Sequence, residues 1–326
     1  MIVVNYESGE SLRRCVGSVL AQPHPAEAVV VVDNGSTDGS ADGLPEGVRV
    51  LERRDNGGFA AALLDGLAAT DERFVLTLNP DTCLLPGCLA AAEAALADDH
   101  RAGSVALRVL QADAPDRIDA DGIGLTSTLG ILNWNHDLSV EQAGDEPQEV
   151  LGPLGGAALW RRQALERAGN FDARYFLYWE DVDIALRLNR AGYECRTVPD
   201  ARVLHEGGGT VGHHSALNIH YMTRNHWPCL LRCLPGRLLR DRAHWVLLAP
   251  LRAAVLYAKR GRAGAALRGL LGGLALAPGA LLDRRHLPRS GSGQRAAERV
   301  RALMRRADEA RLRMRAGAGL PEGAPR

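Results

Sequence analysis

The sequence is poor in lysine, in aromatic residues and in paired cysteines. Of its 39 basic residues, Lys259 is the only lysine, and Phe, Trp and Tyr together make up 5% of the 326 residues. The cysteines lack the paired spacing of a zinc site. No basic-then-apolar leader precedes the strand-like start 2–4, so we expect reduced thiols in a cytoplasmic compartment. The six cysteines are Cys15, Cys83, Cys88, Cys195, Cys229 and Cys233.

The formal net charge is zero, but the two parts of the chain carry opposite charge. Residues 1–229 contain 18 Arg or Lys against 33 Asp or Glu, whereas residues 230–326 contain 21 against 6. A hydrophobic content of 46% with 24% charged residues is typical of folded proteins and argues against global disorder. We therefore expect a folded acidic body followed by a basic C-terminal region.

The order of apolar and polar stretches predicts an α/β fold. Continuous apolar runs indicate buried strands, and amphipathic runs between them indicate helices. The resulting β-α-β-β-α-β order predicts a mainly parallel, Rossmann-like sheet covered by helices on both faces. The polar stretch 111–150 has weak periodicity, so we expect an excursion from the sheet that contains short strands. A helix that starts at residue 180 should end at Gly192. The expected strands are 2–6, the start of 28–40, 48–54 and 73–81, and the first helices are 11–22 and 58–70.

The composition changes near residue 225, where Leu, Ala, Arg and Gly become dominant. We expect one domain over 1–225 and a helical basic region over 226–326. Two apolar segments, 244–260 and 263–282, are interrupted by arginine, proline and glycine, which disfavours a membrane-spanning helix of about 20 apolar residues.

Apolar faces flanked by arginines favour helices that lie on a membrane surface and are attracted to anionic lipid. The alternative is a helical subdomain that packs on the acidic body and neutralises its charge. The arginine-rich stretch 299–317 lacks a recognised nucleic-acid-binding fold, so we expect no nucleic-acid partner. We expect a location on the inner face of the cell membrane, and the sequence does not indicate an oligomeric state.

Polar residues gather where the predicted strands end. Asn5 and Tyr6 end the first strand, Asp33 ends the second, and Asn79 and Asp81 follow a third. Because the ends of parallel strands lie along one edge of a sheet, these residues should converge where open α/β folds bind ligands. An Asx-turn explains Asp33 equally well, since the loop after it is rich in turn-forming residues.

Asn79-Pro80-Asp81 fits either an ordinary turn or a cation site. Mg²⁺ and Mn²⁺ prefer oxygen ligands and often use one or two carboxylates together with substrate phosphates. A proline-stiffened turn would present Asp81 to such a cation. His205 ends a later strand before a glycine-rich loop, which makes it a candidate further metal ligand, although single histidines are usually structural.

Three carboxylates, Glu180, Asp181 and Asp183, crowd the start of the helix at 180. Acidic residues are common there because the helix dipole stabilises them. A carboxylate at this point can also accept a proton from an attacking hydroxyl group. The aromatic residues of 175–179 supply either core packing or a surface that stacks on sugar rings.

Six motifs occur in a consistent order, and each alone is weak. Together they resemble the family 2 inverting glycosyltransferases of GT-A fold, particularly the rhamnosyltransferase-like branch, over about residues 2–226. The motifs are "VVNY", "VVVVDNGSTDGS", "DNGGFAAALLDG", "LNPDT", "GNFDARYFLYWEDVDIALRLNRAGY" and "VLHEGGGT".

The resemblance implies a role for each matched residue. Asp181 is the catalytic base, Asp33 faces the base of the nucleotide, and Asp81 and His205 bind Mg²⁺ or Mn²⁺. Asn79 stands at the first position of the family's Asp-x-Asp motif. The implied nucleotide-sugar-binding residues are Asn5, Tyr6, Asp33, Asn56, Gly58, Asn79 and Asp81. The implied substrate-binding residues are Gly156, Trp179, Glu180 and Arg187.

The implied function is metal-dependent inverting transfer of a hexose or deoxyhexose from a nucleotide sugar, with dTDP-rhamnose as the first donor to test. The acceptor is a hydroxyl of a glycan or lipid-linked saccharide in bacterial surface polysaccharide synthesis. Two alternatives stay open. A sugar nucleotidyltransferase would need a basic phosphate loop after the first strand, where "NYESGES" has no basic residue. A non-catalytic GT-A module would bind nucleotide or glycan as a scaffold.

Overall fold

The computed structural model describes residues 1–23, 26–207, 215–288 and 293–317. Its centre is a ten-stranded sheet in which eight strands follow the order β10-β12-β6-β11-β4-β1-β2-β3, while β5 pairs with β12 and β7 with β6 beside this path. The N-terminal half of the sheet is parallel, as predicted, because β1 pairs with both β2 and β4, and β2 pairs with β3. Its strands are β1 (Ile2–Asn5), β2 (Val29–Asp33), β3 (Val48–Glu52) and β4 (Phe74–Leu78).

The second half of the sheet is mixed, because β11 runs antiparallel between β4 and β6. The long strands β6 and β12 are parallel to each other, and β5 and β10 pair with β12 in the antiparallel sense. These strands are β5 (Thr82–Leu84), β6 (Ala102–Gln111), β7 (Ala114–Ala120), β10 (Glu149–Val150), β11 (Ala157–Arg161) and β12 (Glu194–His205).

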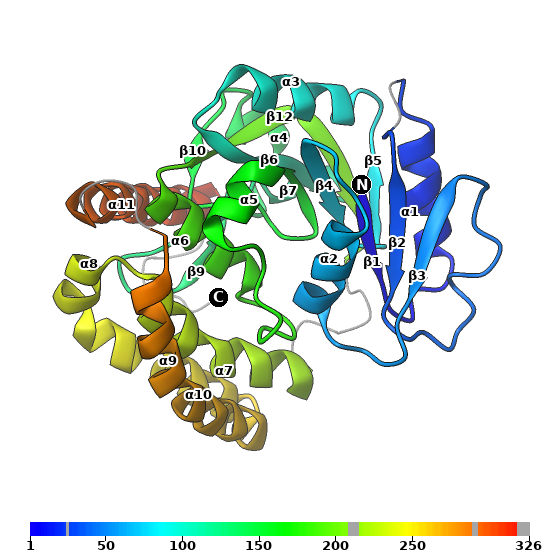
Figure 1. Cartoon of the computed structure of the whole chain (residues 1–326). Helices are drawn as coiled ribbons and strands as arrows, with labels where there is room; N and C mark the ends of the chain where they lie inside the picture. Colours follow the sequence, from blue (N-terminus) through cyan, green and yellow to red (C-terminus); the bar gives the residue numbers. More distant parts are fainter. Residues whose placement is uncertain (24–25, 208–214, 289–292, 318–326) are drawn as a thin grey trace.

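Helices cover both faces of the sheet, as the sequence predicts (Figure 1). Alternate side chains of β1 point to opposite faces: Val3 joins the core under α1 and α3, whereas Ile2 and Val4 join the core under α2, α5 and α6. The helices are α1 (Ser11–Leu20), α2 (Phe59–Ala68), α3 (Cys88–Asp98), α5 (Arg162–Ala168) and α6 (Glu180–Ala191). Helix α6 ends at Gly192, as predicted, in a left-handed conformation (φ 91°).

The excursion predicted at 111–150 is confirmed. It contains β7, a short hairpin of β8 (Ile123–Leu125) and β9 (Ile131–Asn133), the single-turn helix α4 (Val140–Ala143) and β10. Ser139 caps α4 through a capping box with Gln142. The hairpin lies against the C-terminal helix α11, which closes the core at this end.

The C-terminal region is helical, as expected, but its helices share a hydrophobic core with α6. Val182 and Leu186 of α6 contact the same buried cluster as Trp227 and Met304. The boundary predicted near residue 225 falls inside α7, which continues unbroken to Cys233. The elements are α7 (Ala216–Cys233), α8 (Gly236–Asp241), α9 (Ala243–Lys259), α10 (Ala263–Asp283), η1 (Arg284–His286) and α11 (Gly293–Gly317).

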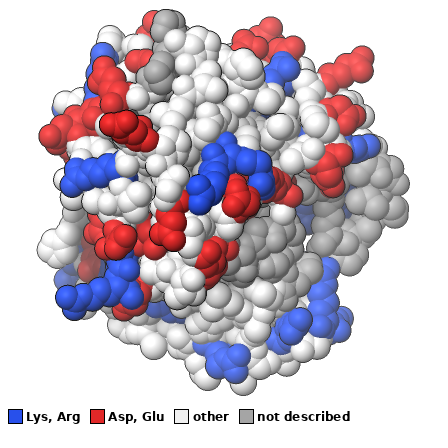
Figure 2. Space-filling view, turned by 90° about the vertical axis from the view of Figure 1, so that its right-hand side faces the viewer, with Lys and Arg blue, Asp and Glu red and all other residues white. Residues whose placement is uncertain are grey.

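The opposite charges of the body and the C-terminal region are visible on the surface. Figure 2 shows the side that carries the β3 edge, with many acidic and some basic side chains over its upper and left parts. At the lower edge of this view, where Figure 1 places α7 and α10, the visible charged side chains are basic.

Candidate active site

The ends of β1 and β2 bring Asn5 and Asp33 side by side, as predicted from the parallel strands. They are register partners, and Asn5 Nδ2 donates a 2.6 Å hydrogen bond to Asp33 Oδ1. Asp33 also accepts hydrogen bonds from the hydroxyl of Ser36 (2.6 Å) and from its backbone N–H (3.0 Å). Asp33 is therefore buried in an Asx-type loop of its own, while Tyr6 beside it is exposed. Contact of Asp33 with a nucleobase stays a prediction.

A second loop is tied to this one through Asn34. Asn34 Nδ2 donates to the carbonyl of Gly58 (3.2 Å), and its Oδ1 accepts from the N–H of Gly57 (3.2 Å). Asn56 Oδ1 accepts from the N–H of Gly58 (2.9 Å). Gly58 has φ 86°, and a Cβ there would lie 2.3 Å from the carbonyl oxygen of Phe176. Asn56 and Gly58 thus shape the loop, and a direct contact with the nucleotide stays a prediction.

Two consecutive glycines, Gly155 and Gly156, allow the predicted base Asp181 and the turn at 79–81, the predicted cation site, to lie close together. A Cβ on Gly155 would lie 3.6 Å from the Cβ of Asp181, and a Cβ on Gly156 would lie 2.3 Å from Cγ of Asn79. The Asn79 N–H also donates to the Gly156 carbonyl (2.9 Å). Asp181 and the turn at 79–81 therefore line the same region of the molecule, on either side of one pair of glycines.

Replacement of Gly156 should disrupt this junction. We expect Gly156→Ala to push the Asn79 side chain out of position, because the new methyl group would lie within 2.3–2.5 Å of its amide atoms. The free energy of unfolding should fall by about 1–3 kcal/mol, measured by urea titration. The matched control is Gly17→Ala in α1, where nothing lies within 4 Å of the added methyl group, and it should be neutral or stabilising. Equal stability of both variants would contradict the steric argument.

The predicted cation ligands Asp81 and His205 are also neighbours, because β5 and β12 pair in the antiparallel sense. His205 Nε2 lies 3.4 Å from Asp81 Oδ2, and Nδ1 lies 2.7 Å from Oδ2 of Asp119. Burial disfavours protonation of His205, but the Asp119 and Asp81 carboxylates outweigh it and raise its pKa to about 10. Gly208 and Gly209 of the following loop lie outside the described residues.

The donor set at Asp81 fits a hard divalent cation completed by substrate. Oδ1 of Asp81 is buried and has no hydrogen-bond partner, so it is available as a ligand. Asp119 holds the far nitrogen of His205, as a carboxylate commonly does for a metal-binding histidine. The described residues contain no group of three or more His, Cys, Asp or Glu arranged to hold a metal. A cation at Asp81 and His205 would have to displace the proton that the raised pKa of His205 retains at neutral pH. It would also need further oxygen ligands, which a diphosphate supplies.

Asp181 has the environment of a base that works near neutral pH. Burial raises its pKa from the ordinary 3.8 to about 6, although the N–H groups of Val182 and Gly155 partly offset this. The neighbouring Glu180 is buried, and burial followed by the Asp181 charge raises its pKa well above the usual value. Oε2 of Glu180 has no hydrogen-bond partner. Contact of Glu180 with substrate stays a prediction.

The backbone just before Asp181 is strained and is held in place by α7. Tyr178 and Trp179 both have positive φ angles (63° and 75°), which is rare for bulky residues. Asn225 donates hydrogen bonds to the carbonyls of Leu177 and Tyr178 (2.9 Å each), and Trp179 Nε1 donates to the carbonyl of Met222 (3.0 Å). The helix at the predicted domain boundary thus positions the candidate base.

Two predicted substrate-binding residues are buried in this structure, and contact of either with substrate stays a prediction. Arg187 is fully buried, and its Nε donates to Asp183 Oδ2 (2.7 Å), so it stabilises α6. Trp179 is 2% exposed and packs against the ring of His226, so it belongs to the core. Their position in the acidic helix motif suggested substrate contact, whereas their side chains point inward.

The sequence motifs did not indicate roles for Asp119 and Asn225, or the hydrogen bonds by which Asn34 joins its loop to the loop at 57–58. The stretch "RIDADG" gives a weak signal for Asp119, because alternation along a strand puts Arg117 and Asp119 on one face. Asn225 has no signal in the sequence, since its function depends on the strained loop that it contacts.

Comparisons with known proteins agree with this geometry. The profile of the family described as "Glycosyl transferase family 2" matches residues 1–169. The chain is 29% identical over 288 residues to an N-acetylglucosaminyl-diphospho-decaprenol L-rhamnosyltransferase of Mycobacterium tuberculosis, covering 77% of this chain and 94% of the relative. It is 27% identical over 221 residues to a galactofuranosyltransferase of the same organism, covering 64% and 69%.

Among solved structures, a mannosyltransferase from Pyrobaculum calidifontis in complex with GDP-Man and Mn²⁺ is similar with a TM-score of 0.55. The sequence identity is 19%, and the match covers 98% of this chain and 85% of that chain. This likeness supports the GT-A-like fold predicted from the sequence. The chain belongs to glycosyltransferase family 2.

Proposed function

We propose that this glycosyltransferase is metal-dependent and inverting, and that it transfers a hexose or deoxyhexose to a hydroxyl of a glycan or lipid-linked saccharide in bacterial surface polysaccharide synthesis. The observation that carries the proposal is the junction at 155–156, where Asp181 and the turn before Asp81 meet. The relative from Mycobacterium tuberculosis makes dTDP-rhamnose the first donor to test.

The proposed reaction needs one base and no covalent enzyme intermediate. Asp181 takes the proton from the acceptor hydroxyl as its oxygen attacks the anomeric carbon of the donor. The bond from that carbon to the diphosphate oxygen breaks on the opposite face, so the anomeric configuration inverts. Burial and the Asp181 charge raise the pKa of Glu180 well above its usual value, which favours the protonated form beside Asp181. The pKa of Asp181, raised to about 6, makes it a stronger base than an ordinary aspartate and still leaves it ionised at neutral pH.

The leaving diphosphate needs charge neutralisation, which a bound Mg²⁺ or Mn²⁺ would supply. Asp81 and His205 would hold the cation, with Asp119 orienting His205 through its 2.7 Å contact. The nucleoside would lie over the ends of β1 and β2, near Tyr6 and Asp33. With the nucleoside and the cation in these positions, the donor sugar would lie beside Asp181.

The proposed location is the inner face of the cell membrane, reached through the C-terminal helices. One helix of the described residues, Ala263–His286, is long and apolar enough to cross a membrane by length and composition. Its face at Gly269 and Gly273 packs closely on α7, where added Cβ atoms would lie 2.6 and 2.7 Å from backbone oxygens. Its leucines at 267, 271 and 274 are more than half exposed. One packed face and one exposed apolar face favour a helix lying on the membrane surface.

A thermal-shift screen tests the donor and the cation. We expect dTDP-rhamnose with Mn²⁺ to raise the melting temperature, because a ligand at 100 times its Kd stabilises the folded state by about 2.7 kcal/mol. The same nucleotides without Mn²⁺ should give a smaller shift. The anomeric configuration of the transferred sugar, measured by NMR of the product, should be opposite to that of the donor. No shift with any nucleotide sugar, or retention of configuration, would contradict the proposal.

A further inference from the structure

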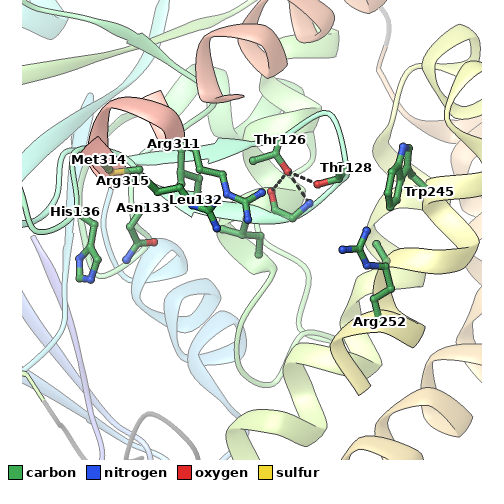
Figure 3. A pocket seen from close by; sticks show the side chains of 13 residues that line it. Thr126, Thr128, Leu132, Asn133, His136, Trp245, Arg252, Arg311, Met314 and Arg315 are labelled. Atoms are coloured by element: carbon green, nitrogen blue, oxygen red, sulfur yellow. Dashed lines mark hydrogen bonds between the residues drawn. The ribbon is translucent and has the colours of Figure 1, made fainter. Parts of the chain in front are cut away.

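A cavity of about 500 Å³ lies between the β8–β9 hairpin, α9 and α11. Figure 3 shows Trp245 and Arg252 entering it from α9, while Arg311 and Arg315 enter it from α11. Thr126 and Thr128 line it from the hairpin. None of the sequence motifs described above includes these side chains.

The cavity is strongly cationic. Three arginines line it, and its described lining contains no aspartate or glutamate. Arg252 lies over the ring of Trp245, with 5.3 Å between its guanidinium carbon and the ring centroid. Neither Arg252 nor Arg311 forms an ion pair within the part of the chain that the structure describes. The nearby Asp308 accepts a hydrogen bond from the N–H of Ser127 (3.2 Å).

This donor set matches a phosphate or diphosphate group. Guanidinium groups bind phosphate oxygens through parallel, charge-assisted hydrogen bonds. The hydroxyls of Thr126 and Thr128 lie 3.1 Å apart, and Thr126 also bonds to Gly130, so the hairpin presents a fixed wall. Arg252 and Arg311 are exposed to solvent, so their guanidinium groups are accessible to an anion that enters the cavity.

Exposed apolar side chains continue from the rim of the cavity along α9. Trp245, Ala249 and Arg252 form the face of α9 that lines the cavity. Leu248 and Val255, on the adjoining stripe of the same helix, are 46% and 55% exposed. A ligand with an anionic head and a long apolar chain is complementary to both features.

The cavity is connected to the candidate active site through His136. This residue lines the cavity, and its Nδ1 lies 2.8 Å from the carbonyl oxygen of Asp119. The Asp119 carboxylate in turn contacts His205, which contacts Asp81. A continuous run of contacting side chains thus joins the cavity to the predicted cation site.

We propose that this cavity binds the phosphate or diphosphate group of a lipid-linked acceptor, with the apolar chain of the lipid lying along α9. The proposal rests on the proposed function for the identity of the acceptor, but it concerns a separate site from that of the donor. Binding can therefore be tested without donor, cation or catalysis.

The test compares farnesyl diphosphate, farnesol and inorganic diphosphate by isothermal titration with the full chain. We expect farnesyl diphosphate to bind more tightly than either fragment. The double variant Arg252→Gln/Arg311→Gln should weaken its binding by about tenfold to a hundredfold, since each lost charge-assisted contact is worth about one factor of ten. The control Arg260→Gln/Arg313→Gln removes the same charge from exposed positions on α9's end and α11 and should leave binding unchanged.

Each remaining outcome overturns the proposal. Equal weakening in both double variants would indicate general charge attraction. Equal binding of inorganic and farnesyl diphosphate would indicate an anion site that does not recognise lipid. Binding of a nucleoside diphosphate with Mn²⁺, measured on the same samples, separates the two sites. The cavity variants should bind it as tightly as the wild type does. Failure of the wild type to bind it would count against the proposed function and not against the cavity.

Discussion

Asp181→Asn is expected to lower the rate of sugar transfer by about 10²- to 10⁴-fold, the range that removal of a positioned general base produces. The amide keeps the shape of the carboxylate and its place beside Gly155 but cannot accept the acceptor's proton. Binding of nucleoside diphosphate with Mn²⁺ should be unchanged, because the proposed donor ligands lie at the ends of strands and not on α6. The measurements are transfer rate at saturating donor and the Kd of the nucleoside diphosphate.

The matched control is Asp200→Asn, an exposed acidic residue on β12. It should transfer sugar at the wild-type rate. Wild-type transfer by Asp181→Asn would show that another group is the base. Loss of nucleotide binding along with activity would instead indicate a disturbed fold. A protein that binds nucleotide but transfers no sugar before any substitution would favour the scaffold alternative.

Asp181→Asn is also expected to change how the stability of the protein depends on pH. The pKa of Asp181 in the folded protein is about 6 against an ordinary 3.8, so the folded state holds the proton more tightly than the unfolded state. Stability therefore falls as pH rises from about 4 to 6 and stays lowered above that range. Asp181→Asn removes this cost, so its melting temperature at pH 7.5 should exceed that of the wild type, and the difference should vanish near pH 4. The wild-type kcat/KM should rise through about pH 6.

The order of strands and helices along the N-terminal part of the chain and the convergence of polar residues were predictable because they depend on local patterns. Apolar runs followed by Asn5, Asp33 and Asn79 indicated parallel strands whose ends meet, and the register of β1 and β2 agrees. The pairing of Arg187 with Asp183 is visible from their spacing of four residues, but its burial was not predictable, because such pairs usually lie on an exposed helix face. The strained backbone before Asp181 is held by Asn225, and contacts so distant in sequence leave no local pattern.

The position of β11 between β4 and β6 is a further feature that local sequence patterns do not predict. Its sequence at 157–161 reads as a buried strand of either direction, so periodicity does not reveal that it runs antiparallel. This strand nevertheless matters for function. Gly155 and Gly156 immediately precede it, and its position beside β4 is what brings Asp181 and Asn79 together.

Asp81→Asn is expected to abolish the stabilisation by Mn²⁺ and to lower transfer by at least about a hundredfold, because a metal ion at a leaving diphosphate contributes several kcal/mol. The substitution replaces a charged ligand by a neutral amide of the same shape. Oδ1 of Asp81 has no protein partner, so the metal-free protein should lose only the stability that comes from the contact of Oδ2 with His205. The readouts are Mn²⁺ affinity by electron paramagnetic resonance, in the presence of nucleoside diphosphate, and melting temperature with and without Mn²⁺.

Asp119→Asn separates the cation role of this cluster from a structural one. Asp119 does not bind the cation in this proposal but holds His205 through a 2.7 Å contact, so Mn²⁺ affinity should fall about 10- to 100-fold and not vanish. The control Asp116→Asn, an exposed residue of the same strand, should keep the wild-type affinity. If Asp81→Asn and wild type bind Mn²⁺ equally, the cation lies elsewhere. If Asp119→Asn matches the wild type while Asp81→Asn fails, His205 does not take part.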